Sequence, residues 1–394
     1  MAGGMIFDYK VSNQKYNAMK INLKLISLML VVFMLAVSSC KDDNEPEPLS
    51  TVEAEAVLAD MGKDMETLMV EMMSTPAAST LFNFMYLSDF DPGIKGQPIP
   101  MASDFKEVYT KDATLSQKAI GVITKMISAS EYVDPFAEEY GTYSWDFANY
   151  TWTYSDLPAD KLVYEFPSDM EQTTNNATLT ISNFSGVEQG EEFFATSLKV
   201  TLHIGNSLVL DVNYEADLSD SGLNSVGVSI SMLPFEMGAN ISITSGSEFS
   251  TITAGFELKK QGVTITSANV ELRVDGSTTI NPFETDDDIE LILTSAKGFV
   301  QMGEVKAQLD LAIADFVAIY DNTTSYQAIV DAANEYLNVT FYTFPEGAKI
   351  GTVVWKWDAT LYDMVPYFRF NDGTEKPLEE VLGLESDLFD DFDF

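Results

Sequence analysis

The feature that most constrains the fold of this chain is a long run of alternating apolar and polar residues between positions 197 and 274. Side chains in a β-strand point alternately to opposite faces, so this pattern predicts at least six antiparallel strands. One face of the sheet would be apolar and the other rich in Ser and Thr, as in sheets that are wetted on one side. The six segments are 197–204, 208–215, 226–232, 235–243, 252–258 and 263–274.

Two places in this run predict details of strand register. A two-residue turn at positions 205–206 would set apolar residues opposite polar ones, because a shift of one residue exchanges the two faces. The pattern therefore favours a three-residue loop at 205–207, which pairs Ile204 with Leu208. Further along, the apolar phase shifts, which predicts a β-bulge near Thr266.

Helices are expected before and after the strand-rich region. Ser50 and Glu53 form a capping-box pattern, and apolar residues follow at helical spacing until Pro76. Shorter helices are predicted at 81–87, at 115–127 and at 378–381, and a late helix near 324–337.

These elements predict an α+β fold that is mainly antiparallel β. We expect a curved sheet or a sandwich, with the N-terminal helices and the late helix packing on its apolar face. Residues 1–39 would hold an N-terminal extension and a leader, 40–49 an acidic linker, 50–140 a helical segment and 141–394 the β-rich domain. Residues 50–394 are also consistent with one domain.

A short aromatic hairpin is predicted between residues 141 and 154. A two-residue turn at 148–149 pairs Trp145 with Trp152 and Tyr143 with Tyr154, so these side chains share one face. Flat aromatic faces suit the stacking of sugar rings, which makes the four residues a candidate ligand platform. The alternative is that this aromatic strand face belongs to the protein core.

The charge of the chain excludes some partners. The formal net charge is −39 and the pI is about 4.1, so nucleic acid and anionic membrane surfaces are unsuitable partners. Arg273 and Arg369 are the only arginines, which leaves few candidates for bidentate recognition of phosphate or carboxylate. The negative charge is compatible with neutral ligands, with cations as ligands, or with simple solvation of the surface.

The segment before the linker has the layout of a secretory signal peptide. Lys20 and Lys24 precede a thirteen-residue run, 25–37, that is apolar apart from Ser27 and is followed by small residues and Cys40. A transmembrane helix needs about 20 apolar residues, so this run is too short to be one. We expect Met19 to be the true start of the precursor.

The residues Val37-Ser38-Ser39-Cys40 resemble the lipobox of bacterial lipoproteins. This resemblance implies that Cys40, the only cysteine, is lipidated and becomes the first residue of the mature chain. Lys41, Asp42 and Asp43 are similar to the acidic export signal of surface lipoproteins in Bacteroidota. The resemblance thus implies an outer-membrane protein at the cell surface; the alternative is an anchor facing the periplasm.

Three further segments resemble an uncharacterised family of Bacteroidota lipoproteins for which no activity is known. They are GTYSW at 141–145, Phe166-Pro167 and TNNA at 174–177. The resemblance implies a cellular location and no mechanism.

Catalytic and metal-binding patterns are weak in this sequence. His203 is the only histidine and lies on the polar face of its predicted strand, so a zinc site with several His ligands is excluded. Asp286, Asp287 and Asp288 are weak candidates for Ca²⁺, and no other cofactor is predicted. An acid pair for glycoside hydrolysis would be one of very many carboxylate pairs, so no pair is singled out.

We therefore expect a lipid-anchored envelope protein that binds a glycan or another nutrient without catalysis. A first alternative is a carrier of an apolar ligand beneath the curved sheet. A second alternative is an acid-pair hydrolase.

Overall fold

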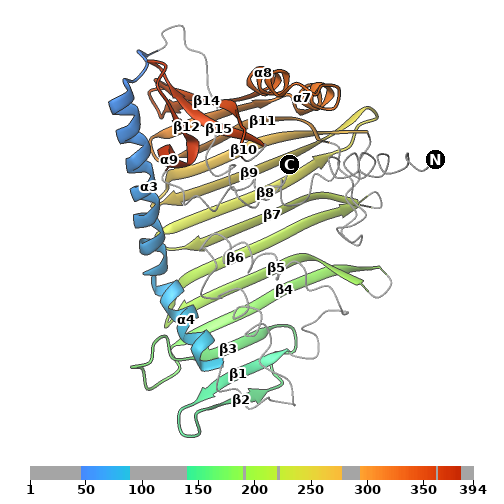
Figure 1. Cartoon of the computed structure of the whole chain (residues 1–394). Helices are drawn as coiled ribbons and strands as arrows, with labels where there is room; N and C mark the ends of the chain where they lie inside the picture. The colour runs from blue at the N-terminus through green and yellow to red at the C-terminus, as the bar shows by residue number, and fades with distance from the viewer. Residues whose placement is uncertain are drawn as a thin grey trace, which may run out of the picture.

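The structure is a computed structural model that describes residues 46–88, 140–189, 192–219, 222–276, 293–360 and 363–382. A single sheet of sixteen strands runs through these residues (Figure 1). The strands are β1 (Gly141–Asp146), β2 (Thr151–Ser155), β3 (Leu162–Phe166), β4 (Ala177–Gln189), β5 (Glu192–Ile204), β6 (Ser207–Ser219), β7 (Gly222–Met232), β8 (Phe235–Thr244), β9 (Phe249–Lys260), β10 (Val263–Asp275), β11 (Leu293–Met302), β12 (Val305–Leu311), β13 (Leu337–Thr343), β14 (Lys349–Asp358), β15 (Asp363–Phe370) and β16 (Glu375–Pro377).

The order of the strands in the sheet almost follows the chain. From β3 to β16 each strand pairs antiparallel with the next, whereas β1 lies between β2 and β3 and runs parallel to β3. The prediction of an α+β fold with a mainly antiparallel, curved sheet is confirmed, and the sheet is one curved layer of strands.

Five described helices accompany the sheet: α3 (Thr51–Met73), α4 (Pro76–Ser88), α7 (Ile313–Tyr320), α8 (Tyr326–Tyr336) and α9 (Leu378–Leu382). In Figure 1, α3 and α4 follow one another along one side of the sheet and cross its strands. The capping box is present, since the Ser50 hydroxyl accepts from the Glu53 amide and the Glu53 carboxylate accepts from the Ser50 amide. The predicted late helix is α8, and α7 was not expected. The predicted helix at 115–127 lies outside the described residues.

Two large hydrophobic cores lie on the apolar face of the sheet. The β1–β6 core joins α4 to the first six strands through side chains such as Phe84, Tyr164 and Leu202. The β9–β15 core joins the first half of α3 to the later strands through side chains such as Leu58, Val270 and Phe368. A much smaller cluster of Leu68, Phe235 and Leu258 lies between them.

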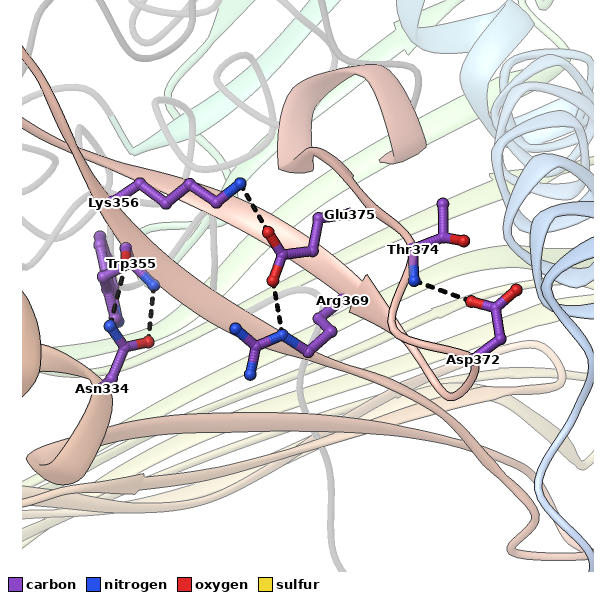
Figure 2. A network of polar contacts seen from close by, with 7 residues as sticks. All are labelled: Asn334, Trp355, Lys356, Arg369, Asp372, Thr374 and Glu375. Atoms are coloured by element: carbon purple, nitrogen blue, oxygen red, sulfur yellow. Dashed lines mark hydrogen bonds and ion pairs between the residues drawn. The ribbon is translucent and has the colours of Figure 1, made fainter.

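Four of the five described helices, α3, α4, α7 and α9, contribute side chains to the two cores on the apolar side of the sheet. Buried residues of α3, α4 and α7 belong to the two cores, and α8 packs on β13 and β14 while α9 contacts α3 and β15. Asn334 of α8 extends this contact, because its amide donates to the Trp355 carbonyl and its carbonyl accepts from the Trp355 amide, each at 2.9 Å (Figure 2).

The predicted register is right in one place and wrong in another. The hairpin pairs Trp145 with Trp152 and Tyr143 with Tyr154, as expected. The three-residue loop at 205–207 is wrong, because Ile204 pairs with Ser207 across a two-residue turn. A β-bulge in β6 then restores the apolar face.

That β-bulge, and not a three-residue loop, keeps the apolar residues of β5 and β6 on the same face of the sheet. His203 pairs with Leu208, yet Leu202 pairs with Leu210, so Val209 is the extra residue. The bulge predicted near Thr266 is confirmed, since the register of β9 and β10 shifts between Thr264 and Thr266.

The middle of the sheet is thinly covered. No residue of β7 is buried, and in β8 only Phe235 is. Ala239 and Ile241 of β8 point to the apolar face but are exposed, and Ile241 retains 43% of its accessible surface. Of the described residues, apolar side chains of β7 pack at the edge of the β1–β6 core and Phe235 of β8 packs on Leu68 of α3. Strands β7 and β8, called the central strands below, are therefore less deeply covered by described residues than the strands on either side.

Candidate functional site

The residues predicted from the leader and from the aspartate cluster lie outside the described part of the chain. These are Cys40, Lys41, Asp42 and Asp43 of the proposed anchor and export signal, and Asp286, Asp287 and Asp288 of the weak calcium candidate. Within the described residues, no group of three or more His, Cys, Asp or Glu side chains is arranged to hold a metal ion.

The aromatic hairpin is part of the core, which corrects its prediction as a ligand platform. Tyr143, Trp145 and Trp152 retain only 2%, 5% and 3% of their accessible surface. Tyr154 is partly buried, and its hydroxyl donates to the Tyr140 carbonyl at 2.7 Å. These rings have no open face on which a sugar could stack.

Helix α4 is the reason for this burial. Phe84 packs edge-on against Trp152, with ring centroids 6.0 Å apart, and against Tyr164 at 5.1 Å. The Trp152 indole donates to the Leu87 carbonyl at 3.3 Å, which gives its buried N–H a partner. The hairpin face therefore serves as the floor on which α4 sits.

The other two tryptophans also contact a helix. The Trp355 indole donates to the Leu337 carbonyl at 3.2 Å, and Trp357 stacks on Tyr326 of α8 with centroids 4.1 Å apart. His203 lies on the polar face, where it is half-buried.

A groove on the polar face of the central strands is the best candidate for a binding site. Two rows of opposed residues cross the sheet from β6 to β11 and form its walls. The first row is Asn213, Ser229, Gly238, Glu257 and Ser267. The second row is Glu215, Gly227, Asn240, Gly255, Asn269 and Phe299.

The floor of this central groove is backbone. The row between the two walls, which includes Val228, Ala239 and Phe256, points its side chains to the other face. The groove encloses about 820 Å³, and an adjoining hollow of about 370 Å³ extends it over Asp211 and Ser231. These volumes are in the range of small-ligand sites.

Glycines keep the groove open. A Cβ atom on Gly238 would meet no atom within 4 Å, and one on Gly227 would meet only the Glu215 carbonyl at 3.9 Å. At Gly255 the space is filled by the Asn240 side chain, whose oxygen would lie 2.4 Å from an added Cβ. Glycine is disfavoured inside strands and often marks a close approach to the backbone; at Gly255 the Asn240 side chain makes this approach, whereas Gly227 and Gly238 leave open space.

The charged groups at one end of the groove are paired. The Glu257 carboxylate binds the Lys259 ammonium at 2.7 Å and accepts from the Thr264 hydroxyl at 2.8 Å. The hydrogen bonds from Lys259 and Thr264 lower the pKa of Glu257, so this carboxyl is ionised at neutral pH. A glycosidase needs one carboxyl group with a raised pKa, which Glu257 is not.

Amide and hydroxyl groups make up much of the rest of the groove. Asn213 donates to Asp211 at 3.0 Å, and the Ser267 hydroxyl bonds the buried Gln301 at 3.0 Å. Asn240 and Asn269 are exposed, and Phe299 adds an aromatic side chain at the β11 end. The arrangement offers donors and acceptors along an open, nearly flat path.

The sequence pointed only partly to this groove. Its Ser and Gly residues lie on the face predicted to be wetted. The predicted ligand platform, however, was the aromatic hairpin and not this face. Phe299 was missed because it lies in β11 (Leu293–Met302), which follows the last of the six strands predicted between 197 and 274. The usable signal was the placement of Gly227, Gly238 and Gly255 on one face of three successive strands.

Comparisons with other proteins add no assignment. No family model matches the chain, and searches of curated proteins and of solved structures find no significant match. Among the described helices, none has both the length and the apolar character that crossing a bilayer requires.

Proposed function

We propose that this chain is a lipid-anchored envelope protein that binds a neutral, hydroxyl-rich glycan in the central groove. Its anchor would be Cys40, in the outer membrane, with the folded part at the cell surface; an anchor facing the periplasm is the alternative. The protein would bind without catalysis. The observation that carries the binding proposal is the glycine-floored groove walled by amide and hydroxyl side chains.

The chemistry of the walls supports a glycan as the ligand class. Sugar hydroxyls both donate and accept hydrogen bonds, which suits the exposed amides of Asn240 and Asn269 and the hydroxyl of Ser229. Phe299 offers an apolar surface for a sugar ring. A shallow path over six strands, β6 to β11, suits an extended chain better than a compact ligand.

Charge supports a neutral ligand. Glu215 and Glu257 line the groove, and the chain as a whole carries a formal charge of −39. Sulfated or uronic-acid polymers would be repelled by this field, most strongly at low salt.

The decisive test is a substitution that places a side chain in the groove from its backbone floor. Gly238→Val places a β-branched side chain in open space, at a strand position where such residues are favoured. The matched control is Ala239→Val, which places the same group on the opposite face of the same strand. Isothermal calorimetry against a panel of neutral and charged polysaccharides should show neutral binding that is lost in Gly238→Val and kept in Ala239→Val.

Two results would count against the glycan proposal. One is the failure of every neutral polysaccharide to bind the folded protein. The other is equal loss of binding in both valine variants, because a groove on one face cannot be blocked from the other.

The anchor has its own test. Cells that make the precursor are fed an alkyne-labelled fatty acid, and the protein is examined for label with Cys40 intact and with Cys40→Ala. We expect label only with Cys40 intact. Label in both proteins, or in neither, would contradict a lipid on this cysteine.

A second candidate is favoured by the other face of the same strands. Ala239 and Ile241 are exposed between the two cores, although they lie on the apolar side. A carrier of an apolar ligand would use this face. The same two variants distinguish the candidates, because Ala239→Val and not Gly238→Val would then change the binding of a fatty acid measured by native mass spectrometry.

A further inference from the structure

The N-terminal end of α3 is fixed to the last strands of the sheet by a clamp of backbone and side-chain hydrogen bonds. The Leu49 amide donates to the Lys349 carbonyl at 2.9 Å. The Asn371 side-chain amide donates to the carbonyls of Leu49 at 3.0 Å and Lys349 at 2.8 Å. Leu49 also packs against the β9–β15 core. We call these three residues the N-terminal clamp.

Further contacts hold the start of α3 at the same place. Glu55 of α3 binds Lys376 of β16 at 2.8 Å, and α3 contacts α9. Next to the clamp, Asp372 accepts from the Thr374 amide at 2.8 Å and shapes the turn between β15 and β16 (Figure 2). The chain therefore enters the fold at a defined point.

We propose that this end of the domain faces the membrane and that the sheet stands upright on it. The proposal rests on the lipid anchor at Cys40 proposed above. Nine residues, 41–49, separate Cys40 from the end of the clamp, and an extended chain spans at most about 3.3–3.6 Å per residue, or about 30 Å. The clamp therefore lies within about 30 Å of the bilayer surface.

The lengths of α3 and α4 give the distance from the N-terminal clamp to the opposite end of the sheet. α3 and α4 contain 23 and 13 residues and follow one another along the sheet (Figure 1). At a rise of 1.5 Å per residue they extend about 55 Å, so the β1–β2 hairpin lies far from the bilayer when α3 points away from it. Leu68 packs on Phe235 and Leu258, roughly 25 Å along α3, which sets the height of the central strands.

Ion pairs compensate part of the negative charge at the clamp end. Residues 46–55 and 346–382, which meet at this end, together contain four basic and ten acidic side chains. Glu375 there is paired with two cations, Lys356 and Arg369, each at 2.6 Å (Figure 2). The net charge of this end stays negative, so a neutral bilayer is a more favourable surface for it than an anionic one.

The orientation has a consequence for the central groove. The groove opens on the polar face, along the side of an upright sheet, and lies between the two ends of the α3–α4 pair. A long polymer could therefore reach it from the surrounding medium without contact with the bilayer.

Energy transfer to a labelled bilayer tests the orientation. The mature chain, 40–394, is coupled through the Cys40 thiol to vesicles that carry a maleimide lipid and an acceptor-labelled lipid. A donor dye is attached through an azide-bearing amino acid at Glu346, which is exposed near the clamp, or at Asn149, which is exposed at the β1–β2 turn. We expect transfer from position 346 to be about twofold or more above that from 149, given the length of α3 and α4.

Equal, high transfer from both positions would mean that the sheet lies flat and would overturn the proposal. A variant makes the test more specific. Asn371→Ala removes the clamp amide, so the difference in energy transfer between positions 346 and 149 should become smaller. Asn322→Ala is its control, since the Asn322 side-chain amide donates to the Ala318 carbonyl of α7, away from the clamp, and its loss should leave the difference in energy transfer unchanged. Because the coupling is chemical, failure of lipidation in cells would not affect this result.

Discussion

The two parts of the sheet that differ most are the end beneath α4 and the central strands. Under α4, side chains such as Tyr164 and Leu202 are fully buried. In the centre, β7 has no buried residue and Ile241 is exposed on the nominally apolar face. Both parts have the same alternation of apolar and polar residues. The comparison teaches that alternation defines two faces, while a covering element decides whether a face becomes a core.

Different interactions stabilise the two parts. Burial of apolar surface contributes about 25 cal/mol per Å² and dominates beneath α4. The central strands bury less apolar surface, so ladder hydrogen bonds and cross-strand pairs, each pair worth roughly 0.2–1 kcal/mol, contribute a larger share of their stability. A part stabilised in the second way can keep one face free for a ligand, and it opens more easily.

The largest expected effect is the loss of the α4 contact. Phe84→Ala removes a buried ring that packs on Trp152, Tyr164 and Phe166, so we expect a loss of about 3–5 kcal/mol in the free energy of unfolding. Urea unfolding followed by circular dichroism measures it. Tyr86→Ala on the same helix removes a half-exposed ring and should cost less. Similar losses in the two variants would show that α4 is not held by its buried side.

A pair of isoleucines compares the two parts directly. Ile181 of β4 is buried, and Ile241 of β8 is exposed, although both lie on the apolar face. Ile181→Ala should cost about 2–5 kcal/mol and Ile241→Ala under about 1 kcal/mol, because only the first leaves a cavity. The shifts of the urea unfolding midpoints of Ile181→Ala and Ile241→Ala from that of the parent chain measure the two costs. A large cost at Ile241 would mean that the centre is covered as well.

The smallest effect concerns the clamp end. The side-chain hydrogen bonds of Lys356 and Arg369 hold the pKa of Glu375 below its usual value. A lowered folded pKa stabilises the fold above the ordinary Glu pKa of about 4.3, and this contribution is lost as the pH falls through the folded pKa. Both cations are well exposed, so we expect only about 0.2–1 kcal/mol.

Glu375→Gln tests this contribution. Its difference from the parent chain in thermal unfolding should be present at pH 7 and should disappear in acid. Asp310→Asn is the control, because the side chains of Asp310 and its partner Lys297 are both largely exposed, so a smaller difference in thermal unfolding is expected. A difference that does not change with pH would indicate a packing effect at Glu375 rather than an ionic one.

Much of the fold could be predicted from local patterns, because each signal acts within a few residues. Ser50 and Glu53 marked the start of α3, and the pairing of Trp145 with Trp152 was correct. The turn at 205–206 could not be predicted, since a loop and a bulge at Val209 both keep the faces apart.

The candidate site was harder to predict for a different reason. Whether Trp152 faces a ligand or a helix depends on α4, which is separated from it by more than fifty residues. The groove depends on the alignment of glycines from three strands, and this alignment follows from register. Helix α7 was missed because its apolar residues, such as Ile313, read equally well as the end of a strand.

The most direct test is hydrogen exchange of the backbone amides, measured without and with the neutral polysaccharide that binds best. We expect the amides of β7 and β8 to exchange faster than those of β3 and β4 in the free protein. The polysaccharide should then slow exchange from β7 to β10 and leave the β1–β2 hairpin unchanged. Uniform protection along the sheet, or slowing confined to the hairpin, would contradict a thin centre that carries the binding groove.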